Sequence, residues 1–186
     1  MPSGLAPAEL GLQVARDPLR LPAGLIVPEP AEGQQVLRAL SETASAPDWW
    51  SGRVTRREVH VVVSPGAIGL NRQMLRLMQG AESVGARGLV VVAPHVSDEA
   101  LATLLVNDMR RVFARGILPL QVLVQEFHVE EMLERIALEL GVAMWDGRPS
   151  VPLVRVAEVS ATPDATDIWR RRRGMLDRMF ERIQRR

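Results

Sequence analysis

Apolar and polar positions alternate in a regular way between residues 58 and 145. Two nearly continuous apolar runs, residues 59–63 and 89–93, are rich in valine and are followed by proline, which is typical of buried strands. Between them, residues 71–84 carry apolar side chains at three- and four-residue spacing, which predicts an amphipathic helix. The pattern therefore predicts a strand, a helix and a second strand in this order.

The same alternation continues toward the C-terminus. Ser97 is a suitable N-cap, and Asp98 and Glu99 stand in the first turn of the next predicted helix, where carboxylates complement the helix dipole. The further predicted elements are helices over 34–40, 97–113, 129–140 and 164–186, and strands over 25–27, 120–124 and 141–145. Because parallel strands need a crossover of helix length, we expect an α/β fold with a mostly parallel sheet flanked by helices.

Composition and the pattern of apolar residues divide the chain into three parts. Residues 1–45 are rich in Pro, Gly and Ala and receive no role, residues 46–160 hold the predicted α/β domain, and residues 161–186 form a basic amphipathic C-terminal helix. A chain of 186 residues suits one domain, because a domain of this size can bury enough surface to be stable alone.

Composition excludes several classes of protein. The chain has no cysteine, which excludes disulfides, thiolate nucleophiles and cysteine-ligated zinc. The N-terminus lacks the basic start and apolar run of a signal peptide, and no apolar stretch is long enough to span a membrane. We therefore expect a cytoplasmic protein with no membrane partner.

The sequence gives little support for catalytic or metal-binding residues. The three histidines, His60, His95 and His128, have no metal-ligand spacing. The acidic pairs at 98–99 and 130–131 fall in first turns of predicted helices, where dipole stabilisation explains them. No glycine-rich phosphate loop or nucleophile elbow is visible. The sequence predicts no enzymatic activity, no metal and no cofactor.

The predicted helix over 97–113 is apolar over an unusually wide arc. Its apolar side chains cover about 200°, against the roughly 100° that one buried stripe requires. These side chains are Leu101, Leu104, Leu105, Val106, Met109, Val112 and Phe113. Either other parts of the chain bury both sides of this helix, or one side lines a partly exposed groove of the kind that binds peptides.

Methionine and tryptophan leave the same two alternatives open. Met74, Met78 and Met109 suit promiscuous binding, because thioethers repack around varied ligands, but methionine also fills cores. Trp49 and Trp50 stand together in a chain with 4% aromatic residues. They are either anchors at an interface or a core residue and its cover.

The segment 93–110, APHVSDEALATLLVNDMR, closely resembles the second groove helix in the apical domain of the group I (GroEL-type) chaperonins. Residues 71–93 resemble the preceding helix and strand of that domain, and residues 121–145 resemble the following strand, helix and strand. The resemblance spans roughly residues 55–145. Residues 45–50, SAPDWW, stand where the family carries an aromatic segment lining the same groove.

The resemblance implies the swivelling β/β/α fold of apical domains and a groove between two helices that binds exposed hydrophobic segments of non-native polypeptides. It also implies a chaperonin or co-chaperonin as a further partner. Carried over position by position, the residues that it implies for peptide binding are Trp49, Trp50, Leu75, Met78, Leu101, Leu105, Val106 and Asn107.

Three departures limit what the resemblance implies. The ATP-binding equatorial domain has no counterpart, so we expect passive binding without ATP hydrolysis. Residues 125–130, QEFHVE, replace a Gly-Phe-Gly-Asp-Arg-Arg stretch of the family, and the helical region after Trp145 is much shorter. The C-terminal helix resembles only faintly the helix that follows an apical domain.

The C-terminal segment supports an alternative function. Arg170, Arg171, Arg172 and Arg173 precede an apolar stripe at helical spacing, so this helix packs on the domain or on a second copy, or binds nucleic acid. In that alternative, the chain is a structural or regulatory assembly protein. Its groove is then occupied permanently by its own tail or by a fixed partner, and a homo-oligomer is one outcome.

Overall fold

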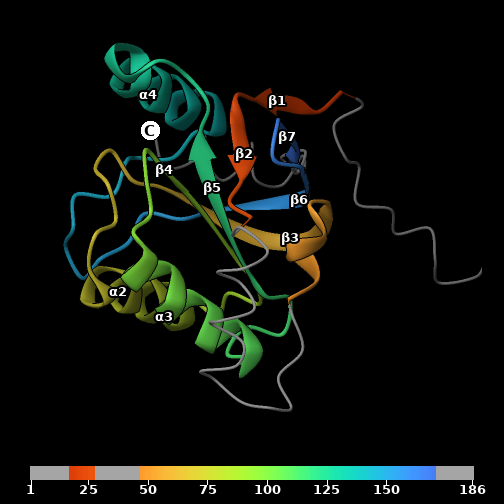
Figure 1. Ribbon diagram of the computed structural model, residues 1–186, viewed down its shortest axis with the longest axis vertical. Coiled ribbons are helices and arrows are strands. Elements are labelled where there is room, and N and C mark those ends of the chain that lie inside the picture. Colours follow the sequence, from red (N-terminus) through yellow and green to blue (C-terminus); the bar gives the residue numbers. More distant parts are fainter. Residues whose placement is uncertain (1–16, 28–46, 171–186) are drawn as a thin grey trace, which may run out of the picture.

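The computed structural model describes residues 17–27 and 47–170 of the chain (Figure 1). Its strands are β1 (Leu19–Leu21), β2 (Ala23–Leu25), β3 (Val54–Val63), β4 (Leu89–Ala93), β5 (Ile117–Val122), β6 (Val154–Ala161) and β7 (Thr166–Arg170). Its helices are α2 (Asn71–Ser83), α3 (Asp98–Met109) and α4 (Val129–Leu140), and the short 3-10 helices are η2 (Asp48–Ser51) and η3 (Glu126–His128). The α/β class is therefore confirmed.

Most elements between residues 58 and 140 lie where the apolar pattern predicts them. Helices α2 and α4 and strand β4 agree closely with prediction, and the Ser97 hydroxyl caps α3 by accepting the Ala100 amide. Helix α3 ends at Met109 rather than 113, because Arg111 has a φ of 53°, which an α-helix cannot contain. Strands β3 and β5 begin five and three residues earlier than predicted.

Other predicted elements differ from the structure. Residues 141–145 form no strand, because Gly141 ends α4 in a left-handed conformation and the chain leaves extended pairing. Residues 166–170, expected to begin the C-terminal helix, form strand β7 instead. The predicted strand over 25–27 is β2, shifted to Ala23–Leu25. The predicted helix over 34–40 and the rest of the C-terminal helix, residues 171–186, lie outside the described residues.

The prediction of a mostly parallel sheet is wrong. The strand order is β1-β7-β6-β3-β4-β5-β2, and only β3–β4 and β4–β5 pair in parallel. The other pairs, β1–β7, β2–β5, β3–β6 and β6–β7, are antiparallel. Part of the error arises after Pro149, where β6 of the β6–β7 hairpin pairs with β3 and prolines in the sequence hide the alternating pattern. The rest arises at residues 19–25, which add β1 to β7 and β2 to β5.

One short segment joins the two ends of this sheet. Strands β1 and β2 are separated only by Pro22, yet β1 pairs with β7 and β2 pairs with β5, at opposite ends of the strand order. The Leu25 amide also donates to the Thr162 carbonyl at 2.8 Å, and the buried Thr166 hydroxyl donates to the Ala23 carbonyl at 2.7 Å. The sheet therefore curls round on itself, as β1, β2, β5 and β7 show in Figure 1.

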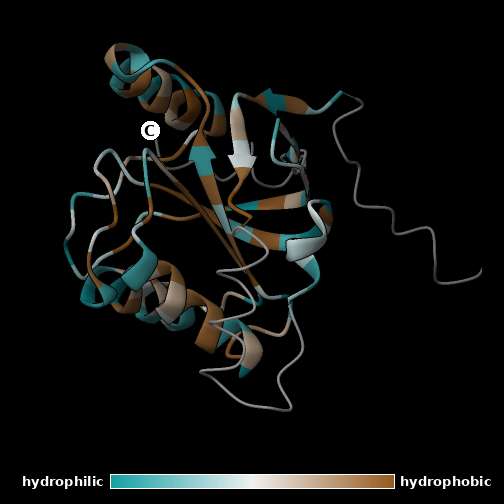
Figure 2. Ribbon diagram, in the orientation of Figure 1, coloured by the Kyte–Doolittle hydropathy of each residue, from teal (hydrophilic) through white to brown (hydrophobic). Residues whose placement is uncertain are grey.

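Helices cover this sheet on two sides. Helices α2 and α3 lie next to each other on one side, and α4 lies on the other (Figure 1). Strand β4 is fully buried along its length, and its brown colour in Figure 2 marks the centre of the core. Hydrophobic burial here anchors the α2–α3 pair on a rigid support.

Candidate functional site

The candidate site is the outer surface of α2 and α3, which we call the α2–α3 face and define by Leu75, Leu101, Val106 and Asn107. The starts of the two helices are tied together, because the Ser97 hydroxyl donates to the Gly69 carbonyl at 2.8 Å. The Ser97 amide also donates to the Ile68 carbonyl at 2.9 Å. These bonds hold the start of α3 beside the start of α2, and the two helices are in contact.

The structure divides the predicted peptide-binding residues into two groups. Trp49, Met78 and Leu105 are buried, with 0%, 4% and 2% of their surface exposed. Leu75 is 42% exposed, and the partly buried residues are Trp50, Leu101, Val106 and Asn107. Only this second group can touch a partner without a change in the core. The wide apolar arc of α3 therefore contributes Leu104 and Leu105 to the core and Leu101 and Val106 to the surface.

The adjacent tryptophans form part of the support under this face. The Trp49 and Trp50 rings meet edge to face with centroids 5.9 Å apart. Trp49 is fully buried, and its indole Nε1 donates to Asp108 Oδ2 on α3 at 3.2 Å. Trp50 is half-buried, and its Nε1 has no hydrogen-bond partner among the described residues. Trp49 thus acts as a structural link between η2 and α3.

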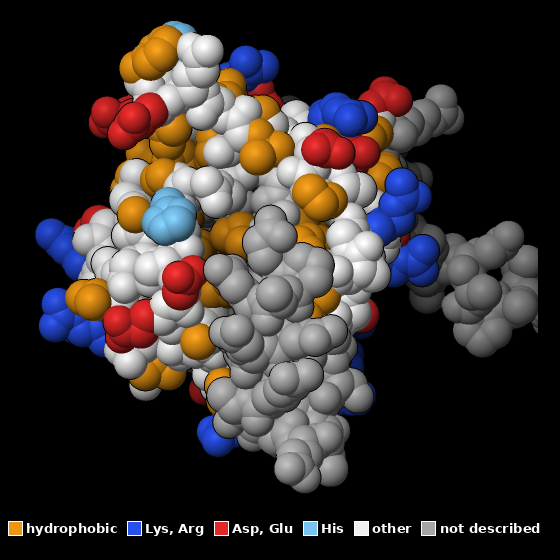
Figure 3. Space-filling view, viewed as in Figure 1, with side chains coloured by type: hydrophobic (Ala, Val, Ile, Leu, Met, Phe, Trp, Pro, Cys, Tyr) orange, Lys and Arg blue, Asp and Glu red, His pale blue; other side chains and the backbone are white. Residues whose placement is uncertain are grey.

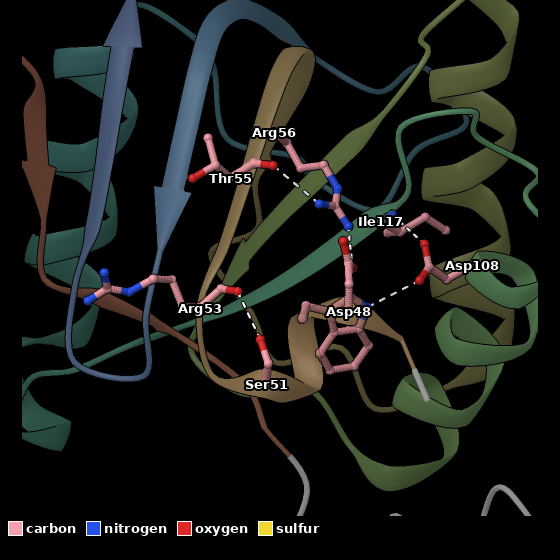
Figure 4. A network of polar contacts seen from close by, with 8 residues as sticks. Asp48, Ser51, Arg53, Thr55, Arg56, Asp108 and Ile117 are labelled. Carbon is pink, nitrogen blue, oxygen red and sulfur yellow. Dashed lines mark hydrogen bonds and ion pairs between the residues drawn. The ribbon is translucent and has the colours of Figure 1, made fainter. Parts of the chain in front are cut away.

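Asp108 is the centre of a polar network that sequence reasoning missed (Figure 4). Its Oδ1 accepts the Ile117 amide of β5 at 2.9 Å, while Oδ2 accepts Trp49. Burial raises the pKa of the Asp108 carboxyl, and the hydrogen bonds from Ile117 and Trp49 and the nearby Arg56 charge oppose this rise. The network holds the last turn of α3 against β5 and η2.

Arg56 extends the network toward solvent. Its guanidinium forms an ion pair with Asp48 of η2 at 2.5 Å and also donates to the Thr55 carbonyl. The sequence contained one indication of this network, because Asp108 stands at the end of an otherwise apolar helix face. The partners of that aspartate are far away in sequence, however, so spacing alone could not identify them.

Among the described residues, His60 on β3 is a second group with a shifted pKa. Burial, followed by the Arg155 charge, lowers the pKa of His60 on β3, and the Glu58 carboxylate opposes this effect. Arg155 itself pairs with Glu58 at 2.6 Å. Among residues 17–27 and 47–170, no group of three His, Cys, Asp or Glu side chains could hold a metal ion. Over the same residues, no helix combines the length and apolar character of a membrane span.

Comparison with known proteins adds little to this geometry. No protein-family model matches the chain, and no curated protein matches it in sequence. Among solved structures, it is similar to the chaperonin gp146 from the bacteriophage EL 2 (Pseudomonas aeruginosa), with 13% sequence identity and a TM-score of 0.41. The match covers 70% of this chain and 30% of that chaperonin chain. A TM-score this low does not establish a shared fold.

Proposed function

We propose that this chain binds exposed hydrophobic segments of other polypeptides on the α2–α3 face, without hydrolysing ATP and without enzymatic activity. The observation that carries the proposal is the exposure of apolar side chains on two adjacent, fixed helices. Leu75 is 42% exposed on α2, and Leu101 and Val106 remain accessible on α3. Apolar side chains on neighbouring helices are a common surface for an extended or helical peptide.

The resemblance of residues 93–110 to the apical domains of GroEL-type chaperonins supports the same proposal. Those domains bind non-native polypeptides through the corresponding two helices. The structure leaves five of the carried-over residues at least partly accessible: Trp50 on η2, and Leu75, Leu101, Val106 and Asn107 on the α2–α3 face. The same face is our proposed contact for a chaperonin or co-chaperonin segment.

The accessible area sets the expected strength of binding. Burying one aliphatic side chain contributes about 1.5–3 kcal/mol, and association itself costs several kcal/mol. Three aliphatic side chains would contribute about 4.5–9 kcal/mol even if they were fully exposed before binding, so after the cost of association we expect a dissociation constant weaker than about 0.1 mM. Because apolar burial has no directional requirement, we also expect little sequence specificity. Asn107 adds a polar group at the edge, although its amide nitrogen is already bonded to the Thr103 carbonyl at 2.7 Å.

A peptide-binding experiment tests the proposal. A fluorescent hydrophobic peptide is titrated with the wild type, with Leu75→Glu/Val106→Glu, and with Phe127→Glu as the control, at low and high salt. Phe127 is 76% exposed on η3, outside the α2–α3 face, so its change controls for exposed apolar surface in general. We expect affinity to fall at least about tenfold in the double variant, a loss of about 1.4 kcal/mol, and to be unchanged in the control.

Leu105 is unsuitable for this test, because a charge at a side chain with 2% exposure would destabilise the core. Equal binding by the double variant and the wild type, with both folded, would contradict the proposal. Binding that salt alone abolishes would instead indicate an electrostatic site. In that case, the Arg-rich alternative for nucleic acid, through Arg170 and residues 171–173, would be the next to test.

A further inference from the structure

The outer face of α4 is acidic and carries an exposed leucine. Leu133, Ile136, Ala137 and Leu140 face the core, whereas Glu130, Glu131, Glu134 and Leu138 face outward. We call these four outward residues the acidic face of α4. Leu138 is 80% exposed, more than any other large apolar side chain of the described residues. In Figure 3, acidic and apolar side chains lie together over α4, at the upper left.

The charges of this face are mostly uncompensated within the described residues. Arg135 is paired with Glu139 at 3.0 Å, and Glu131 approaches only His128, at 3.8 Å. Glu130 and Glu134 have no ion-pair partner among the described residues. An exposed leucine among unpaired carboxylates matches a partner that combines an apolar stripe with positive charge.

The described part of the chain ends beside this helix. Arg170, the last residue of β7, donates from its Nη1 to the Glu139 carbonyl in the last turn of α4, at 3.0 Å. A cation at this position also complements the negative end of the helix dipole. The described part of the chain therefore ends within one arginine side chain of the C-terminal end of α4.

The sequence that follows has the complementary chemistry. Residues 171–186 contain seven arginines against Asp177 and Glu181. Met175, Leu176, Met179, Phe180 and Ile183 recur at the spacing that predicts an amphipathic helix. At a rise of 1.5 Å per residue, these 16 residues would span about 24 Å as a helix, and the 12 residues of α4 span about 18 Å.

We propose that residues 171–186 dock as a helix on the acidic face of α4 of their own chain. The segment runs antiparallel to α4, because it starts at the C-terminal end of that helix. Its apolar stripe covers Leu138, and its arginines face Glu130, Glu131 and Glu134. The tether at Arg170 favours this occupant over a second copy, because it gives the segment a high effective concentration at α4. Since α4 and the α2–α3 face lie on different sides of the sheet, this inference is independent of peptide binding.

The absence of cysteine from the chain permits a direct test by crosslinking. Two cysteine pairs follow from the antiparallel register: Leu138→Cys with Leu176→Cys, and Glu131→Cys with Ile183→Cys. The second pair lies seven residues before the first on α4 and seven residues after it on the C-terminal segment. In an antiparallel arrangement the two cysteines of each pair therefore face each other, within reach of a short bis-maleimide. The crossed pair, Leu138→Cys with Ile183→Cys, is offset by about 10 Å. Leu75→Cys with Leu176→Cys is the control at an exposed position of α2.

We expect both matched pairs to crosslink within the monomer at least about tenfold faster than the crossed pair and the control, because docking raises the local concentration of one thiol at the other. Glu130→Lys/Glu134→Lys should slow the Leu138–Leu176 crosslink, whereas Glu82→Lys on α2 should not. Similar rates for all pairs would overturn the proposal. Crosslinked dimers in place of crosslinked monomers would also overturn it, and would make a second copy the occupant of α4.

Discussion

At the scale of single residues, Asp108 shows how one polar side chain organises an apolar neighbourhood. It satisfies an amide of β5 and the indole of Trp49, two donors that would otherwise lose their acceptor inside the protein. The same burial that makes these bonds valuable raises the pKa of the carboxyl. The stability contribution of Asp108 therefore depends on pH in a direction that follows from this shift.

We predict that Asp108→Asn changes the pH dependence of unfolding. Between the ordinary pKa of an aspartate and the raised pKa of Asp108, the folded state binds more protons than the unfolded state. The contribution of Asp108 to the free energy of unfolding should then fall with rising pH through this window, and level off above it. The variant, which cannot titrate at this position, should lack this component.

Urea unfolding of the wild type and the variant over a series of acidic pH values measures this difference. Asp146→Asn, at a carboxylate whose side chain is 56% exposed, is the matched control. A constant difference between wild type and Asp108→Asn across the whole pH range would show that the Asp108 pKa is not raised.

At the scale of elements, specific local contacts rather than helix propensity set the two ends of α3. Ser97 closes its start by accepting the Ala100 amide at 3.2 Å and by donating to Gly69 in the turn before α2. Asp108 and the left-handed Arg111 close its end. Both ends of the helix that carries Leu101 and Val106 are thus fixed to neighbouring elements.

We predict that Ser97→Ala lowers the free energy of unfolding by about 0.5–2 kcal/mol, because it removes the cap of α3 and its bond to the α2 turn. Chemical denaturation measures the loss. Thr103→Ala on the same helix is the control, since its hydroxyl only bonds the Glu99 carbonyl within α3. An equal loss in both variants would mean that capping is not the cause.

At the scale of the whole molecule, closure of the sheet depends on the close approach of β2 to the turn between β6 and β7. A Cβ atom at Gly24 would lie 1.8 Å from the Pro163 carbonyl oxygen, which no side-chain movement can relieve. Glycine is therefore required where the segment 19–25 passes between β5 and this turn.

We predict that Gly24→Ala lowers the free energy of unfolding by about 1–3 kcal/mol or more, because the clash is with backbone and forces β2 away from its partners. Gly66→Ala is the matched control, since nothing lies within 4 Å of a Cβ at that position. Thermal or urea unfolding of both variants measures the effect. A Gly24→Ala protein as stable as the wild type would show that the sheet does not need this closure.

The sequence by itself determined the elements whose apolar spacing is local and uninterrupted. Residues 89–93 and 129–140 are examples, because a buried strand or a helix face is encoded in neighbouring positions. The cap at Ser97 is equally local. For the candidate site, the sequence also indicated the α2–α3 pair, including Leu75, Leu101 and Val106.

Only the tertiary structure decided the features that join distant parts of the chain. The pairing of β6 with β3, the closure by residues 19–25 and the partners of Asp108 all depend on contacts more than eight residues apart. The burial of Met78 and Leu105 and the exposure of Leu75 were decided in the same way. Periodicity reports which side of an element is apolar, but the packing of whole elements determines which of those apolar side chains remain at the surface.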